Sequence, residues 1–137
     1  MTGERKKLVK RLDTLCREIL LQRDRFYGEM FCCISCRRLL PLNCAQVGHY
    51  VSRRYESYRW DLRNIHLECN SCNNPQWGST SLIEYRKSLV EMYGEEEVSN
   101  IEATYRKSPK YSVFDLKLLV AEYQKKLKEL KEEGIHG

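Results

Sequence analysis

The cysteines are the residues whose spacing most directly indicates chemistry. The chain has seven of them, and four form two CxxC pairs, Cys33 with Cys36 and Cys69 with Cys72. A CxxC turn lets two thiolates bind one ion, and two such turns complete the tetrahedral site that zinc prefers. Thiolate sulfur selects zinc or an iron–sulfur centre over hard cations. We therefore predict a structural zinc site, with the segment between the pairs as a folded insert.

Two alternatives use the same four cysteines. They could be buried free thiols, or one pair could be a redox CxxC, although no thioredoxin-like βαβ pattern surrounds either pair. Among the remaining cysteines, Cys32 could compete as a ligand but lacks the two-residue spacing of Cys33. Cys16 is expected in a helix core, and Cys44 is expected as a small strand residue.

Two histidines lie in the insert, within the stretch GHYVSRRYESYRWDLRNIHLECNSCNN. Because four cysteines satisfy a zinc ion, the histidines are free for other chemistry. A neutral imidazole can take a proton from water at physiological pH, so His49 is a candidate general base for phosphodiester hydrolysis. The amide of Asn73 could hold Mg²⁺ or Mn²⁺, and the amide of Asn64 could fix the hairpin loop. His66 is open: a second ligand of that ion, a phosphate donor or a structural residue.

Hydrophobic spacing predicts the elements that position these residues, in an α+β fold. Apolar residues at helical spacing predict a first helix, and the segment from Phe31 to Asn74 reads as irregular turns with one β-hairpin. Its first strand ends near His49, and its second is expected at Arg59–Arg63. A capping box at Ser81–Glu84 predicts a further helix that stops at Gly94. The helices are expected at about 4–25, 81–94, 95–107 and 113–133.

The last helix carries an apolar stripe that needs a partner. It could pack on the central domain, on the first helix, or on a second copy in a homodimer. Packing within one chain is favoured, because fewer than four heptads is weak evidence for a coiled coil. The expected organisation is a basic amphipathic helix at 1–30, a zinc-bound core at 31–94 and a helical extension at 95–137. The stripe consists of Leu116, Leu119, Val120, Tyr123, Leu127 and Leu130.

The net charge of +5 is concentrated in two places. Residues 1–25 and 37–63 are rich in Arg and Lys, which suits a polyanionic partner such as DNA. Tyrosines and Trp60 alternate with the arginines, and could stack on unpaired bases or belong to the hairpin core. No apolar run is long enough to span a membrane, and the N-terminus lacks a signal peptide, which predicts a cytoplasmic protein. The DNA-binding candidates are Arg53, Arg54, Arg59 and Arg63.

The motifs CISC, GHY, LRNIH, CNSCN and AEYQKKLKEL occur in one unbroken order from about residue 23 to 130. In this combination the chain resembles the NinG/Rap recombination proteins of lambdoid phages, a branch of the HNH nucleases. The resemblance implies a zinc-stabilised ββα-metal (HNH, treble-clef-like) core with flanking N- and C-terminal helices. It also implies a phage- or prophage-encoded protein acting in the cytoplasm of a bacterial host.

The resemblance further implies a structure-directed endonuclease that cuts branched DNA such as Holliday junctions and D-loops. In this reading His49 is the general base, Asn64 fixes the central loop, and Asn73 binds a catalytic Mg²⁺ or Mn²⁺ ion. The alternative from another class is a non-catalytic zinc module that binds DNA or a recombination partner. A third reading, an HNH enzyme that nicks ordinary duplex, differs only in substrate.

The chain departs from the HNH pattern at two positions. Many HNH enzymes have an acidic residue or histidine before the base, whereas this chain has Gly48. Another group must then complete the shell of the ion, with Gln46, His66 or water as candidates. A lysine that usually follows CxxCN is absent from CNNPQWGS, where Gln76 and Trp77 stand instead. Arg53 and Arg54 are the expected substitutes for phosphate binding.

Overall fold

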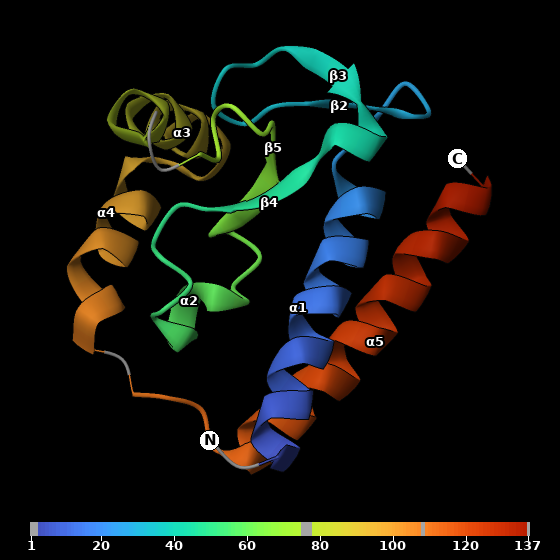
Figure 1. Cartoon of the computed structure of the whole chain (residues 1–137), viewed down its shortest axis with the longest axis vertical. Helices are drawn as coiled ribbons and strands as arrows, with labels where there is room; N and C mark the ends of the chain where they lie inside the picture. The colour runs from blue at the N-terminus through green and yellow to red at the C-terminus, as the bar shows by residue number, and fades with distance from the viewer. Residues whose placement is uncertain (1–2, 75–77, 108, 137) are drawn as a thin grey trace.

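Two long helices from opposite ends of the chain pack side by side. The computed structural model describes residues 3–74, 78–107 and 109–136. Helices α1 (Gly3–Arg23) and α5 (Val113–His136) run along each other at one side of the molecule (Figure 1). Their apolar faces meet in the main core, which includes Leu12 and Ile19 of α1 and Leu116 and Leu127 of α5. The prediction that the apolar stripe packs within one chain is confirmed, and of the two partners left open the structure shows the first helix.

An antiparallel hairpin lies at the centre of the molecule. It pairs β4 (Gln46–His49) with β5 (Ile65–Glu68), with Gly48 opposite His66 and His49 opposite Ile65. The second strand was expected at Arg59–Arg63, and this is wrong, because Glu56–Arg59 forms the short helix α2 and tight turns follow it. In those turns the Asp61 carboxylate accepts the backbone N–H of Arg63. The chain therefore pairs with β4 only from Ile65 onward.

A second, three-stranded sheet precedes the hairpin and was not predicted. Its strands β1 (Arg25–Phe26), β2 (Met30–Cys32) and β3 (Leu39–Pro41) pair in that order, all antiparallel. With two or three residues each, these strands are too short for an alternation of apolar and polar residues to be recognised in the sequence. The 3₁₀ turn η1 (Leu42–Cys44) follows. Cys44 is exposed on this turn, so its expected place in a strand is wrong.

Helices α3 (Gly78–Tyr93) and α4 (Glu95–Thr104), followed by the 3₁₀ turn η3 (Tyr105–Lys107), cover the other side of the hairpin (Figure 1). Gly94 ends α3 with a positive φ of 93°, a backbone conformation that favours glycine. Ser81 was expected to cap α3, but the helix already begins at Gly78, and Ser81 donates to the carbonyl of Cys72. Gln76 and Trp77, which stand where the resemblance leads one to expect a lysine, lie outside the described residues.

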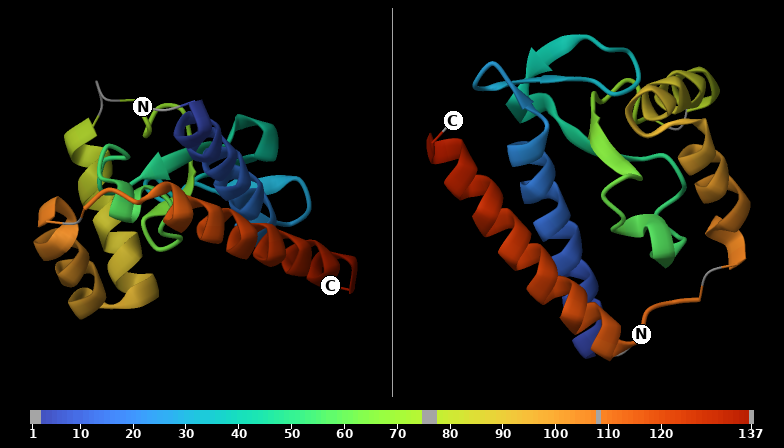
Figure 2. Two further views of the ribbon diagram at one scale, coloured as in Figure 1. Left: turned by 90° about the horizontal axis from the view of Figure 1, so that it is seen from below. Right: turned by 180° about the vertical axis from the view of Figure 1, so that it is seen from behind.

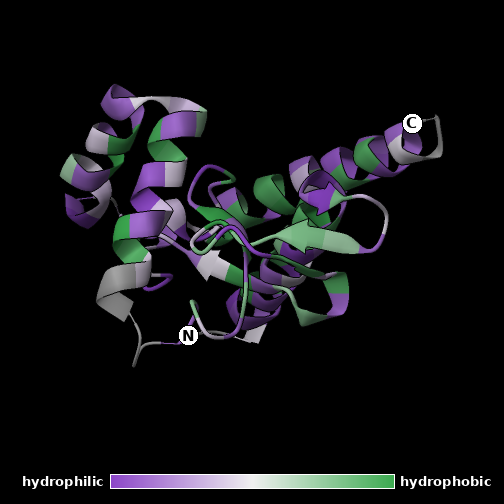
Figure 3. Cartoon of the chain, turned by 90° about the horizontal axis from the view of Figure 1, so that it is seen from above, coloured by the Kyte–Doolittle hydropathy of each residue, from purple (hydrophilic) through white to green (hydrophobic). Residues whose placement is uncertain are grey.

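The hairpin therefore lies between the α1/α5 pair and the α3/α4 pair, as the view from behind also shows (Figure 2). The helices are amphipathic, with hydrophilic and hydrophobic residues alternating along them (Figure 3). The main core combines Phe31, Trp60 and Ile65 with residues of α1 and α5, so all three expected segments contribute to it. The division at 1–30, 31–94 and 95–137 stays a prediction. Within the described ranges, no helix is both long and apolar enough to cross a membrane.

Candidate metal centre and histidine cleft

The four predicted zinc ligands come together in space. The sulfur atoms of Cys33, Cys36, Cys69 and Cys72 all lie within 4.8 Å of one another. An ion bound tetrahedrally at about 2.3 Å from each sulfur would place the sulfurs about 3.8 Å apart. The Cys36 and Cys69 sulfurs are 3.9 Å apart, which fits. The four cysteines can hold a structural metal such as zinc.

Arg38 compensates the negative charge of this thiolate cluster. Its guanidinium donates to the sulfur of Cys36 at 3.5 Å and to that of Cys69 at 3.8 Å. Burial alone would raise the pKa of the Cys36 thiol, but the hydrogen bonds from Arg38 lower it to about 7. The backbone N–H of Cys69 also donates to the Cys33 sulfur at 3.4 Å. These donors favour the deprotonated sulfur that binds a metal.

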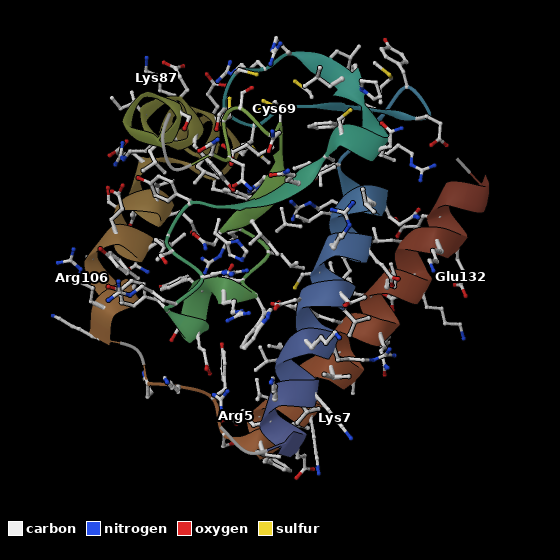
Figure 4. The ribbon with its side chains drawn as sticks, viewed as in Figure 1. Arg5, Lys7, Cys69, Lys87, Arg106 and Glu132 are labelled. Atoms are coloured by element: carbon white, nitrogen blue, oxygen red, sulfur yellow. The ribbon has the colours of Figure 1, made fainter. Side chains whose placement is uncertain are left out.

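The metal centre joins three parts of the fold. The first CxxC follows β2, and the second lies between β5 and α3, where Figure 4 labels Cys69. The backbone N–H of Ile34 donates to the carbonyl of Leu67 in β5 at 3.1 Å, and Ser88 of α3 donates to the carbonyl of Ile34 at 2.6 Å. A metal bound here would hold the hairpin and α3 in a set arrangement.

His49 lines a separate cleft of about 690 Å³ between the hairpin and α1. The cleft is also lined by Asn73 and Gln46 beside the hairpin, by Arg53 and by Arg17 of α1. None of the four clustered cysteines lines it. The histidine and the cysteine cluster therefore belong to two different sites.

The hydrogen bonding of His49 assigns its protons. Its Nε2 lies 3.0 Å from the backbone carbonyl of Arg59. A carbonyl only accepts, so Nε2 carries the hydrogen, and in the neutral ring Nδ1 is the atom that can take a proton. Burial holds the pKa of His49 below 6.5, although the Arg59 carbonyl acts in the opposite direction. The imidazole is thus neutral and basic at physiological pH.

Asn73 is positioned by a second amide. Its Nδ2 donates to Oε1 of Gln46 at 2.9 Å, and Gln46 in turn donates to Asn70 at 3.0 Å. Because the amide nitrogen makes this bond, Oδ1 is the atom of Asn73 with the capacity to bind a cation. Amide oxygen suits Mg²⁺ or Mn²⁺.

Asn64 ties the loop between the two strands. Its side chain is fully buried, accepts the N–H of Val51 at 2.8 Å, and donates to the carbonyls of Val51 and Tyr58, each at 3.0 Å. Its own carbonyl accepts the N–H of Tyr50. These bonds hold the residues after His49 in place.

His66 does not join His49. Side chains alternate along a strand, and His66 lies opposite Gly48, on the face covered by α3. Its Nδ1 lies 3.3 Å from the Tyr85 hydroxyl and its Nε2 3.0 Å from that of Tyr93. Burial, helped by Arg23, lowers the pKa of His66 to about 4. Of the three roles left open for His66, these contacts and its burial favour that of a structural residue over that of a ligand of an ion near His49.

Comparison with known proteins places the chain in a family. A family model described as "Bacteriophage Lambda NinG protein" matches residues 2–133. The chain belongs to the NinG family. It is 36% identical to protein ninG of Escherichia phage lambda over 100 residues, 72% of this chain and 47% of that protein. It is 37% identical to protein ninG of Salmonella phage P22 over 101 residues, 73% of this chain and 48% of that protein.

The chain thus spans about half the length of the NinG relatives that it matches. No solved structure gives a significant match. Membership in the NinG family, as the motifs indicated, is confirmed.

Within this NinG-family fold the four candidate arginines separate into two groups. Arg53 and Arg59 line the His49 cleft, and Arg54 is exposed beside it, with its guanidinium over the Tyr55 ring. Arg59 is held by Asp13 of α1 through two bonds of 3.1 and 2.6 Å. Arg63 pairs with Asp61 and with Glu97 of α4, outside the cleft. Of these four arginines, Arg53 both lines the cleft and is exposed, and Arg54 is the exposed residue that follows it in the chain.

The sequence did not indicate which residues of α1 would line the cleft. Asp13 lies there and accepts the indole N–H of Trp60 at 2.8 Å as well as the Arg59 guanidinium. Arg17, one turn later, is exposed at the cleft and donates to the carbonyl of Ala45 at 3.2 Å. The only signal was a charged residue, Asp13, next to the apolar stripe of the helix. Trp60 itself is 1% exposed, which favours the hairpin-core reading over base stacking.

Proposed function

We propose that this protein is a metal-dependent DNA endonuclease of the HNH (ββα-metal) class that cuts branched DNA, such as Holliday junctions and D-loops, in a bacterial host. One observation carries the proposal: His49, Asn73 and Arg53 line a single cleft on a β-hairpin that a four-cysteine site holds against α3. A basic imidazole, an oxygen ligand and a phosphate-binding guanidinium are the groups that phosphodiester hydrolysis needs.

In the proposed mechanism, Nδ1 of His49 takes a proton from the attacking water while the Arg59 carbonyl fixes the ring through Nε2. Arg53 binds the phosphate backbone beside the scissile bond, and Arg17 approaches from the α1 wall of the cleft. Asn73 would hold a divalent ion, which when bound stabilises the charge on the phosphorus centre and on the leaving oxygen. Asn64 keeps the loop after His49 in register.

A cleavage panel tests this function directly. Zinc-loaded protein is incubated with duplex, nicked, flap, D-loop and four-way DNA, each with Mg²⁺, Mn²⁺ or EDTA. We expect cleavage of the branched substrates that depends on Mg²⁺ or Mn²⁺. Cleavage of ordinary duplex at the same rate would point to a general nicking enzyme. DNA binding that persists in EDTA, with no substrate cut, would support the alternative of a non-catalytic zinc module.

The cleavage rate should stay high into mildly acidic solution. The base acts in its neutral form, which is present above its pKa, and burial holds the pKa of His49 below 6.5. The rate should therefore fall only as the pH drops through a value below 6.5. A single-turnover pH–rate profile on a four-way junction checks this. An acid limb centred at or above 6.5 would contradict the assignment of His49 as the base.

Replacing both Arg53 and Arg54 with alanine should weaken DNA binding and reduce its dependence on salt. Each lost phosphate contact lowers the slope of log K against log salt concentration by about 0.9 on duplex arms, or about 1.8 for both. The matched control removes two exposed lysines of α5, Lys125 and Lys126, which lie outside the cleft. An equal effect of both double variants would mean that the arginines contribute only net charge.

Symmetric resolution of a junction would need two active sites and therefore two copies of the chain. The apolar stripe of α5 is already used by α1, so a homodimer through this helix would have to use its outer face. Phe114 and Leu118 are 68% and 56% exposed there, one turn apart. Dimerisation stays a prediction, and sedimentation of the protein with and without junction DNA tests it.

A further inference from the structure

The carboxylate of Asp13 on α1 binds two consecutive residues of another segment at the His49 cleft. Its Oδ1 accepts Nε of Arg59 at 3.1 Å and the indole N–H of Trp60 at 2.8 Å. Its Oδ2 accepts Nη2 of Arg59 at 2.6 Å. Arg59 is the last residue of α2 and Trp60 follows it directly, so one carboxylate of α1 holds both side chains at the end of that helix.

The peptide group between these two residues is the one that contacts the proposed base. Its oxygen, the carbonyl of Arg59, lies 3.0 Å from Nε2 of His49 and accepts the hydrogen there. A peptide group is planar and turns only about the bonds to its two Cα atoms. Because Asp13 binds the side chains that leave from both Cα atoms, it restrains the direction in which this carbonyl points.

Helix α2 by itself gives this carbonyl little support. The last four carbonyls of an α-helix have no partner inside the helix. Helix α2 is only four residues long, so the carbonyl of its last residue, Arg59, depends on groups outside the helix. The bonds from Asp13 supply such a restraint from α1.

Asp13 also brings a negative charge near the imidazole. Burial lowers the pKa of His49, and the Arg59 carbonyl and the charge of Asp13 act against it. The guanidinium groups of Arg59 and Arg53 lower the pKa further. A ring that takes a proton from water becomes positive, and a nearby carboxylate favours that form. The charge of Asp13 and its hydrogen bonds therefore both favour the base.

We propose that Asp13 is a positioning residue for His49, acting through the peptide group between Arg59 and Trp60. By restraining the Arg59 carbonyl, it keeps the hydrogen on Nε2 and leaves Nδ1 as the atom that takes the proton. The inference rests on the proposed function, because it gives α1 a part in the hydrolysis. The competing account is a link that only fastens α1 to α2.

Asp13→Asn tests this role with a small change of shape. The amide oxygen can still accept the indole N–H, but the amide nitrogen cannot accept from Arg59. Cleavage of a four-way junction in a single turnover should slow by about 10²-fold, the cost of a misplacement of about 1 Å, with unchanged DNA affinity. The matched control is Glu18→Gln, which removes the same charge from an exposed position on α1 and should cleave like the wild type.

The variant is expected to fold. The side chain of Asp13 is 41% exposed, and an ion pair this accessible contributes little to stability. Should Asp13→Asn fail to fold, Arg59→Lys takes its place. Lysine keeps the charge but lacks the planar fork that binds both carboxylate oxygens at once. It should lose rate in the same way, and a full wild-type rate would overturn the inference.

A double-mutant cycle separates positioning from a purely structural link. If Asp13 acts through His49, Asp13→Asn should have no further effect on the residual rate of His49→Ala. A link that only stabilises the cleft would lower both rates by the same factor. An equal loss in the presence and absence of His49 therefore overturns the inference.

Nitrogen NMR of the His49 ring gives a readout that does not need activity. The chemical shifts of the two ring nitrogens show which one carries the hydrogen. We expect it on Nε2 in the wild type and shared between both nitrogens in Asp13→Asn. A wild-type tautomer in folded Asp13→Asn overturns the role of Asp13, and cleavage of branched DNA would then stand without it. A tautomer that depends on Asp13, with no DNA cut, supports the positioning and refutes the nuclease function.

Discussion

Replacing His49 with alanine is expected to slow cleavage of a four-way junction by about 10²–10⁴-fold, the usual contribution of a positioned general base. The loss should appear in the rate of the chemical step and not in DNA affinity, because the phosphate contacts are proposed for Arg53 and Arg54. His49 is half-buried at the end of β4, and its ring contacts the Arg59 carbonyl at 3.0 Å. Removing it costs one hydrogen bond of about 1 kcal/mol, so the variant should fold.

Two controls make this result specific. Imidazole added to the His49→Ala protein can enter the open cleft and should restore part of the rate, which a purely structural histidine would not allow. His66→Gln is the matched histidine variant on the opposite face of the hairpin; glutamine can still bond to the tyrosine hydroxyls there. Once folded, it should cleave at nearly the wild-type rate. Full cleavage by folded His49→Ala would remove His49 from the mechanism.

Replacing Cys69 with serine should abolish zinc binding and unfold the protein. Structural zinc sites contribute an apparent binding free energy of about 10–16 kcal/mol, as large as the whole stability of a typical domain. Cys69 is 4% exposed, belongs to the main core, and its sulfur lies 3.9 Å from that of Cys36. Loss of this ligand should release both the hairpin and α3. Metal analysis and thermal unfolding by circular dichroism measure the two effects.

Cys44→Ser is the matched control for this prediction. Cys44 is exposed on η1, and its sulfur is not among the four clustered sulfur atoms. The variant should keep one zinc per chain and a wild-type melting temperature. A stable Cys69→Ser protein that retains its zinc would show that the cysteine cluster does not hold the fold together.

The helices and the metal cluster could be predicted because each depends on local spacing. Apolar residues three and four apart determine the buried face of α1 and α5, and two residues between cysteines determine a turn that directs both sulfurs to one point. The second strand could not be predicted in the same way. Trp60 favours a strand, but α2 ends at Arg59, and the hydrogen bonds of Asp61 and Asn64 accompany tight turns in the residues that follow.

The sequence by itself therefore determined the NinG family, the four clustered cysteines, His49 and Asn73 as the chemical groups of interest, and the packing of the last helix within one chain. Only the tertiary structure decided which of these groups meet. It separated His66 from His49, because neighbouring residues of a strand face opposite sides. It also brought Asp13 and Arg17 of α1 to the cleft. Contacts between distant segments depend on how elements pack, and spacing along the chain carries no record of them.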